Sequence, residues 1–147
     1  MQLKVNATNW QRAAAFAVRM QVFVRERGLA LQDEFDDQDN DGTIYAVIYH
    51  NDEPVATGRF KQLDATTMRP GRIATLASQR GNGLGAKIII ALEQVGRQHG
   101  CTQSVIHSEL TAQGFYAKLG YQPSGEPFSE DGVPCILLTK QLTPVID

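Results

Sequence analysis

The stretch Arg80-Gly81-Asn82-Gly83-Leu84-Gly85 joins two apolar segments and decides how the chain folds. The short apolar run 73–77 precedes it. After it, apolar residues recur at helical spacing until Gly100, at Leu84, Ile88, Leu92 and Val95. The pattern predicts a strand, a glycine loop and a helix in succession.

Alternating glycines at the start of a helix predict an anion site. They free backbone amides to point at one spot, and the helix N-terminus adds a partial positive charge there. A pyrophosphate is the natural occupant of residues 80–85. The alternative is a tight turn that needs glycine only for its dihedral angles.

Two familiar phosphate-binding patterns fit the loop poorly. A P-loop needs Gly-Lys-Ser/Thr, whereas Gly85-Ala86-Lys87-Ile88 lacks both the adjacent lysine and the hydroxyl. Gly81-x-Gly83-x-x-Ala86 satisfies the dinucleotide fingerprint literally. However, a hairpin precedes it and only about 60 residues follow, too few for a doubly wound sheet.

The rest of the chain predicts a mixed sheet with helices on both faces. Thr8 and Gln11 form a capping box for a first helix that runs to about Val24. An acid-rich loop, 28–42, follows it. We expect an antiparallel hairpin from strands at 44–49 and 55–63, and later a strand at 104–107, a short helix at 111–119 and a strand at 135–140.

Length, charge and cysteine content narrow the class of protein. The 147 residues predict one domain spanning 1–147, and the net charge of −2 argues against a nucleic-acid partner. No apolar run approaches the ~20 residues of a membrane helix. Cys101 and Cys135 form no CxxC pair, so neither a zinc site nor a disulfide framework is expected. We expect a cytoplasmic protein.

Two motifs in the right order resemble the GNAT superfamily of N-acetyltransferases. Residues 80–85 resemble its Arg-x-x-Gly-x-Gly coenzyme A signature, and Phe115-Tyr116-Ala117-Lys118-Leu119-Gly120-Tyr121 resembles its Phe-Tyr-x-Lys-Leu-Gly-Phe segment. Weaker similarity at 19–26, 54–59 and 125–134 is to a bacterial subgroup of mostly undefined acceptor. The resemblance implies a three-layer α/β/α fold whose mixed, mostly antiparallel central sheet splays at the cofactor slot.

The resemblance also implies roles for individual residues. The amides of Arg80, Gly81, Asn82, Gly83, Leu84 and Gly85 would hold the pyrophosphate of acetyl-CoA. The main chain of Ile73, Ala74 and Thr75 would pair with the pantetheine arm like an added strand. Tyr116 would protonate the departing thiolate, although aromatic residues at this spacing also pack in cores. Glu109 stands where the family usually has an amide side chain.

The implied reaction is direct transfer of the acetyl group to a primary amine in a ternary complex. The acceptor would be a small-molecule or peptide amine, and a homodimer stays open. A non-catalytic acyl-CoA-binding module or sensor is the competing interpretation, and acetyl-CoA turnover with an amine panel would separate the two.

Carboxylates near the slot are expected to take a proton from the amine. Family architecture points to Glu26, Glu34, Asp36 and Glu126, with Glu34 and Glu126 favoured as catalytic residues. The stretch from Asp37 to Asp41 copies half of an EF-hand loop, but Ile48 stands where a bidentate carboxylate is needed. We therefore expect a solvated acidic loop and no metal.

Overall fold

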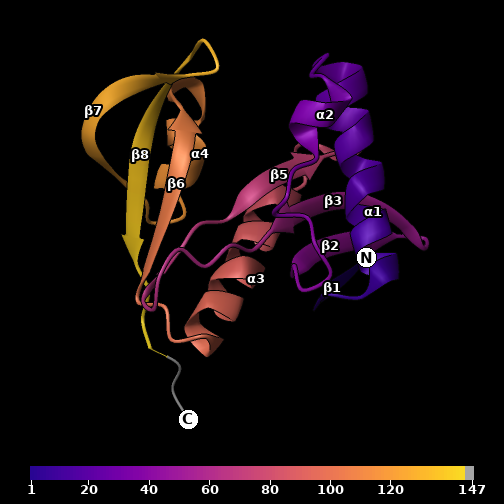
Figure 1. Ribbon diagram of the computed structural model, residues 1–147, viewed down its shortest axis with the longest axis horizontal. Helices are drawn as coiled ribbons and strands as arrows, with labels where there is room; N and C mark the ends of the chain where they lie inside the picture. Colours follow the sequence, from indigo (N-terminus) through magenta and orange to yellow (C-terminus); the bar gives the residue numbers. More distant parts are fainter. Residues whose placement is uncertain (145–147) are drawn as a thin grey trace. The chain divides into compact units, whose positions relative to one another are not determined.

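The computed structural model describes residues 1–144 and divides them into two compact units. The first unit contains residues 1–61 and 70–95, and the second contains residues 62–69 and 96–144. Figure 1 labels the strands of each unit, apart from β4, as they are named below. Within the described chain, no helix is long and apolar enough to cross a membrane.

The sheet of the first unit is antiparallel, in the order β1-β2-β3-β5. Its strands are β1 (Gln2–Asn6), β2 (Tyr45–His50), β3 (Glu53–Arg59) and β5 (Gly71–Thr75). The predicted hairpin is confirmed as β2 and β3. Asn51 and Asp52 both have positive φ, 52° and 65°, as a tight hairpin turn requires. Strand β3 ends at Arg59, before the predicted Leu63, and residues 62–69 belong to the second unit.

Helices cover both faces of this sheet. They are α1 (Asn9–Arg19), the π-helix η1 (Met20–Glu26), α2 (Leu31–Glu34), the 3-10 turn η2 (Ala77–Gln79) and α3 (Leu84–Gln98). Thr8 caps α1, as predicted, by accepting a hydrogen bond from the Gln11 amide at 3.3 Å. Residue Ala15 of α1 packs with Tyr45 and Val47 of β2.

Glycine at position 58 lets α3 approach the other face of β3. A Cβ there would lie 2.5 Å from Ile88 Cγ2 and 2.9 Å from Leu92 Cδ1, which is closer than real Cβ atoms come. The neighbours Thr57 and Arg59 alternate with Gly58 along the strand and so point to the opposite face. The predicted strand, glycine loop and helix are thus β5, residues 80–83 and α3.

The sheet of the second unit has the order β4-β6-β8-β7. Its strands are β4 (Thr67–Met68), β6 (Gln103–Glu109), β7 (Gln122–Glu130) and β8 (Val133–Gln141). Only β4 and β6 run parallel. The 3-10 turn η3 (Leu110–Ala112) and α4 (Gln113–Ala117) form the short helix predicted at 111–119. The content is therefore mixed α/β with mostly antiparallel strands, as predicted.

Candidate active site

The glycine loop has the backbone conformation expected of an anion cradle. Gly81 and Gly83 have φ of 85° and 75°, and α3 begins directly after them at Leu84. A Cβ at either glycine would meet no atom within 4 Å. Glycine is therefore required for the left-handed dihedral angles and not for close packing within the protein. The open side of the loop, at the N-terminus of a fifteen-residue helix, can accept an anion.

Strand β5 leads into this loop and lies at the edge of its sheet. It pairs with β3 alone, so its other edge can bind an extended ligand. The side chain of Ala74 packs with Val22 and Phe23 of η1, and Ile73 lies against Gly58. These two side chains belong to the core. The predicted pantetheine contacts would therefore use main-chain groups of residues 73–75 on the edge of β5 that faces away from β3.

Arg80 connects the loop to two other elements of the same unit. Its Nη2 contacts Glu26 Oε2 at 2.7 Å, Nη1 contacts Oε1, and Nε donates to the Thr75 carbonyl at 3.0 Å. The hydrogen bond from Arg80 lowers the pKa of Glu26 below its usual value, and the same bond raises the pKa of Arg80. Glu26, which the sequence analysis considered for the acceptor, is thus paired with Arg80 beside the glycine loop.

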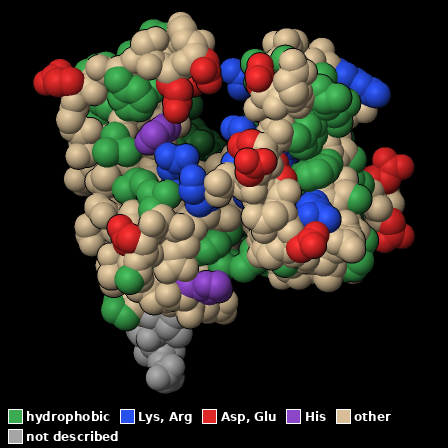
Figure 2. Space-filling model, viewed as in Figure 1, with side chains coloured by type: hydrophobic (Ala, Val, Ile, Leu, Met, Phe, Trp, Pro, Cys, Tyr) green, Lys and Arg blue, Asp and Glu red, His purple; other side chains and the backbone are tan. Residues whose placement is uncertain are grey.

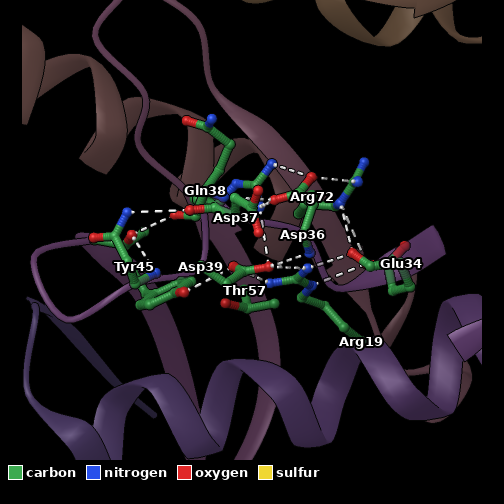
Figure 3. A network of polar contacts seen from close by, with 12 residues as sticks. Arg19, Glu34, Asp36, Asp37, Gln38, Asp39, Tyr45, Thr57 and Arg72 are labelled. Carbon is green, nitrogen blue, oxygen red and sulfur yellow. Dashed lines mark hydrogen bonds and ion pairs between the residues drawn. The ribbon is translucent and has the colours of Figure 1, made fainter. Parts of the chain in front are cut away.

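The buried guanidinium of Arg19 forms ion pairs and hydrogen bonds with the acidic segment, residues 33–41 (Figure 3). Nε of Arg19 lies 2.9 Å from Glu34 Oε1, and Nη1 lies 2.7 Å from Asp39 Oδ1. Nη2 donates to the Glu34 carbonyl at 2.8 Å. The rings of Phe16 and Phe35 lie 5.2 and 4.7 Å from the guanidinium carbon. Charge pairing and aromatic contact together compensate for the burial of this cation.

Two more arginines complete the charge network, which we define as Arg19, Arg59, Arg72, Glu34, Asp36 and Asp39. Arg59 lies 2.9 Å from Asp36 and 3.1 Å from Asp39. Arg72 lies 3.1 Å from Asp36 and 3.5 Å from Glu34, and its φ of 52° is in the left-handed region that favours glycine. The network therefore links the acidic segment to α1, β3 and β5.

Asp39 is the most strongly perturbed carboxylate of the network. Burial alone would raise the pKa of Asp39, but hydrogen bonds from Arg19 and Tyr45 outweigh it and hold this pKa well below its usual range. The Tyr45 hydroxyl donates to Asp39 Oδ1 at 2.8 Å, and burial together with that bond raises the pKa of Tyr45. Asp39 is thus a buried, ionised structural group.

These contacts bear on two expectations for the acidic segment. A solvated loop was expected, but the side chains of Glu34 and Asp39 are only 3% and 2% exposed. Pairing with Arg19 and Arg72 favours a structural role for Glu34 over service to an acceptor. The sequence held a signal: Arg19 shares one helical face with Ala15, Val18 and Val22, so its charge had to be buried and paired.

The second unit contains Tyr116 on α4. Its ring lies 5.0 Å from that of Phe115 and 6.0 Å from that of Tyr121, measured between centroids. Burial, reinforced by the negative charge of Glu109, raises the pKa of Tyr116. The phenol is therefore protonated at neutral pH and chemically able to donate a proton. The departure from the family at Glu109 thus acts on the tyrosine's electrostatics.

Glu126, the other predicted catalytic carboxylate, lies exposed on β7 of the second unit. It falls where the pairing of β7 with β8 shifts register, between Ser124 and Phe128. The structure therefore brings Glu34 and Asp36 into the charge network of the first unit. The Glu26–Arg80 pair lies beside the loop in the same unit, whereas Tyr116 and Glu126 belong to the second unit.

No metal site accompanies these groups in the part of the chain that is described. Residues 1–144 hold no group of three or more His, Cys, Asp or Glu side chains placed to bind an ion. Acidic and basic side chains are interspersed on the face shown in Figure 2.

The acetyltransferase (GNAT) family model matches residues 7–121. A curated relative from Streptococcus pyogenes, an uncharacterized acetyltransferase in the arcA 3′ region, is 48% identical over 112 residues, 76% of this chain and 77% of its own. YyaT of Bacillus subtilis, an uncharacterized protein, is 36% identical over 145 residues, 97% of each chain. The chain therefore belongs to the GNAT family of acetyltransferases.

Solved structures agree. A Lactobacillus plantarum protein described as a candidate N-acetyltransferase has a TM-score of 0.92 at 41% identity, covering 97% of this chain and 98% of its own. Escherichia coli ElaA shares the fold alone, with a TM-score of 0.81 at 23% identity over 95% of this chain and 98% of its own. The predicted GNAT fold and the prediction of an acetyl-CoA-dependent N-acetyltransferase are confirmed.

The charge network predicts a pH-dependent stability that Asp39 dominates. Asp39→Asn should lower the free energy of unfolding at pH 7 by about 3 kcal/mol, because it removes one of the two carboxylates that pair with each of the buried arginines Arg19 and Arg59. A carboxylate whose pKa is lower in the folded than in the unfolded state stabilises the fold at pH values above its unfolded-state pKa. This stabilisation is lost as the pH falls through the folded-state pKa. The wild type should therefore lose more stability than the variant from neutral pH to below pH ~4 in urea titrations.

Asp41→Asn is the matched control, since the Asp41 side chain is 95% exposed and pairs only with Arg12 at 3.1 Å. It should change stability by less than about 0.5 kcal/mol. Equal effects of the two substitutions would contradict a dominant buried network.

Proposed function

We propose that this acetyltransferase moves the acetyl group of acetyl-CoA directly to a primary amine, of a small molecule or a peptide, within one ternary complex. The observation that carries the proposal is the left-handed loop at Gly81 and Gly83, which joins an edge strand to the N-terminus of α3. We take residues 1–147 as one acetyltransferase domain. Cys101 and Cys135 are free and buried, which fits a reducing cytoplasm.

The cofactor groups of the proposal all lie in the first unit. Backbone amides from Arg80 to Gly85 would bind the pyrophosphate, with the partial charge of the α3 N-terminus adding to the attraction. The main chain of Ile73 to Thr75 would pair with the pantetheine arm along the outer edge of β5. Both interactions use backbone groups. The chemistry therefore depends on dihedral angles and strand position more than on side-chain identity.

The transfer itself needs one proton donor and one proton acceptor. The neutral amine nitrogen attacks the thioester carbonyl, the carbon–sulfur bond breaks, and Tyr116 gives its phenolic proton to the departing sulfur. The attacking nitrogen loses a proton to a carboxylate or to water, and the phenolate regains one from solvent. The raised pKa of Tyr116 keeps the phenol protonated at neutral pH, which is the form that the proposed role requires.

Glu126 is the carboxylate that we favour for taking the proton from the acceptor amine. It is exposed on β7, whereas Glu34 is buried against Arg19. Glu34 remains in the proposal chiefly as a residue that positions the acidic segment. The competing function, a non-catalytic acyl-CoA sensor, would bind the cofactor equally well but release no thiol with any amine.

Binding of acetyl-CoA should raise the thermal stability of the wild type, because ligands that bind only the native state stabilise it. Gly83→Val should abolish that shift, since valine resists the φ of 75° and fills the open side of the loop. Gly132→Val is the control, at a φ of 78° with similarly open space in the β7–β8 turn. An unchanged shift in Gly83→Val would rule out the cradle.

Removal of the Tyr116 hydroxyl should slow chemistry and spare binding. We expect Tyr116→Phe to lower kcat by ~10²-fold, the scale of general acid catalysis, with little change in the acetyl-CoA dissociation constant. Tyr121→Phe is the matched control, because it also removes a tyrosine hydroxyl, one that lies 2.8 Å from Ser104 Oγ. Thiol release with a reactive amine measures both. Wild-type turnover in Tyr116→Phe would remove this residue from the mechanism.

Neutralisation of Glu126 should impair turnover of a cationic amine. We expect Glu126→Gln to lower kcat/KM by ~10²-fold and to remove an acidic limb from its pH profile, since the base must be ionised. The acetyl-CoA dissociation constant should stay unchanged. Glu130→Gln, near the end of the same strand, is the control. A Glu126→Gln profile that overlays the wild type in height and shape would show that this carboxylate does not serve the acceptor.

A further inference from the structure

Arg80 makes three contacts that hold the ends of two elements, η1 and β5, at the glycine loop. Its two Nη atoms face both oxygens of Glu26, the last residue of η1. Its Nε donates to the carbonyl of Thr75, the last residue of β5. Arg80 itself precedes the first left-handed glycine. We call this arrangement the Arg80 clamp: Arg80, Glu26 and Thr75.

The clamp is a geometric device as well as a charge pair. A guanidinium that meets a carboxylate through two parallel hydrogen bonds is fixed in orientation, unlike a single-point contact. Glu26 and Arg80 are exposed, at 41% and 45%, so the pair needs no buried surroundings to form. Because three nitrogens of Arg80 already bind protein oxygens, phosphate oxygens could replace Glu26 only by breaking the clamp.

The position of Glu26 follows from the π-helix that presents it. Val22 and Phe23 of η1 pack against Ala74, which anchors the segment on β5. The Arg27 amide donates to the Val22 carbonyl at 3.0 Å, an i→i−5 bond that adds a residue to the last turn. Such π-helical segments are rare and frequently occur at functional sites. The turn thus sets the direction from which Glu26 reaches the loop.

The loop has much conformational freedom to lose when it binds an anion. Two glycines follow Arg80, and glycine loses more backbone entropy on ordering than any other residue. Another side-chain contact of the loop is local: Asn82 Nδ2 donates a hydrogen bond to the Gln79 carbonyl at 3.2 Å. A contact that fixes the entry to the loop before the ligand arrives therefore lowers the ordering penalty of binding.

We infer that Glu26 is a positioning residue of the cofactor site, which holds Arg80 and thereby shapes the loop and the end of β5 for acetyl-CoA. The inference rests on the proposed function only in taking residues 80–85 as the pyrophosphate site. The inference gives Glu26 a role in cofactor binding, whereas the sequence analysis considered it for taking a proton from the acceptor amine.

The direction in which removal of Glu26 changes coenzyme A affinity separates a positioning role from a purely electrostatic one. A carboxylate beside an anion site repels the anion, so a Glu26 that acted only through charge would weaken coenzyme A binding, and its removal would tighten binding. A Glu26 that positions the loop strengthens coenzyme A binding, so its removal weakens binding. If Arg80 were itself a phosphate ligand, freeing it from Glu26 would also tighten binding.

The test is a double-mutant cycle on coenzyme A affinity, measured by calorimetry at low salt. Glu26→Gln and Arg80→Ala should each raise the dissociation constant about fivefold, the upper end for an exposed ion pair. The double variant should bind no more weakly than either single variant, because the clamp is lost only once. KM for acetyl-CoA should rise with kcat nearly unchanged. Glu53→Gln, an exposed carboxylate at the start of β3, should bind as the wild type does.

A charge reversal and an exchange measurement complete the experiment. Glu26→Arg combined with Arg80→Glu should recover part of the lost affinity relative to either reversal alone. In the absence of ligand, amides 81–84 should exchange with deuterium faster in Glu26→Gln than in the wild type. Tighter or unchanged binding in Glu26→Gln, or additive losses in the double variant, would overturn the inference. A wild type that binds no coenzyme A would overturn the proposed function, and the inference with it.

Discussion

A chain that leaves β5 must turn within a few residues to enter α3, and it does so through two glycines with left-handed dihedral angles. Everything assigned to the cofactor depends on that turn. It places free backbone amides at the start of a long helix, where an anion is electrostatically favoured. Gly58 supports the arrangement from within the unit, because a larger residue would push α3 away from β3. The Arg80 clamp then ties the entry of the turn to η1 and β5.

A second constraint comes from the buried cation of Arg19. Placing a guanidinium on the apolar face of α1 is unfavourable unless carboxylates follow it into the interior. Glu34 and Asp39 do so, and Asp36 joins them through Arg59 and Arg72 (Figure 3). The acidic segment is thereby linked to β5, the strand that precedes the glycine loop. Glu34, Asp36 and Asp39 are thus paired with arginines, and this pairing favours a structural role for them.

The sequence predicts those features of the fold that depend on local rules. The capping box at Thr8, the β2–β3 hairpin and the glycine loop before α3 all follow from short-range chemistry. Strand β7 was missed because Pro123, Gly125 and Pro127 interrupt it, and it exists as an exposed edge that pairs only with β8. Strand β1 is also an exposed edge, but Leu3 and Val5 alternate with polar residues in it, so its pattern was open to prediction from the sequence. The pairing of Glu26 with Arg80 and of Arg19 with Asp39 joins residues 54 and 20 positions apart, which no local pattern encodes.

The central claim is that backbone amides of residues 80–85 bind the pyrophosphate of acetyl-CoA in this acetyltransferase. A crystal structure of the protein with coenzyme A tests it most directly. The account predicts phosphate oxygens within about 3.2 Å of amide nitrogens in this loop, and the pantetheine arm extended along the main chain of Ile73 to Thr75. A structure in which the pyrophosphate binds elsewhere, with the loop unliganded, would contradict it.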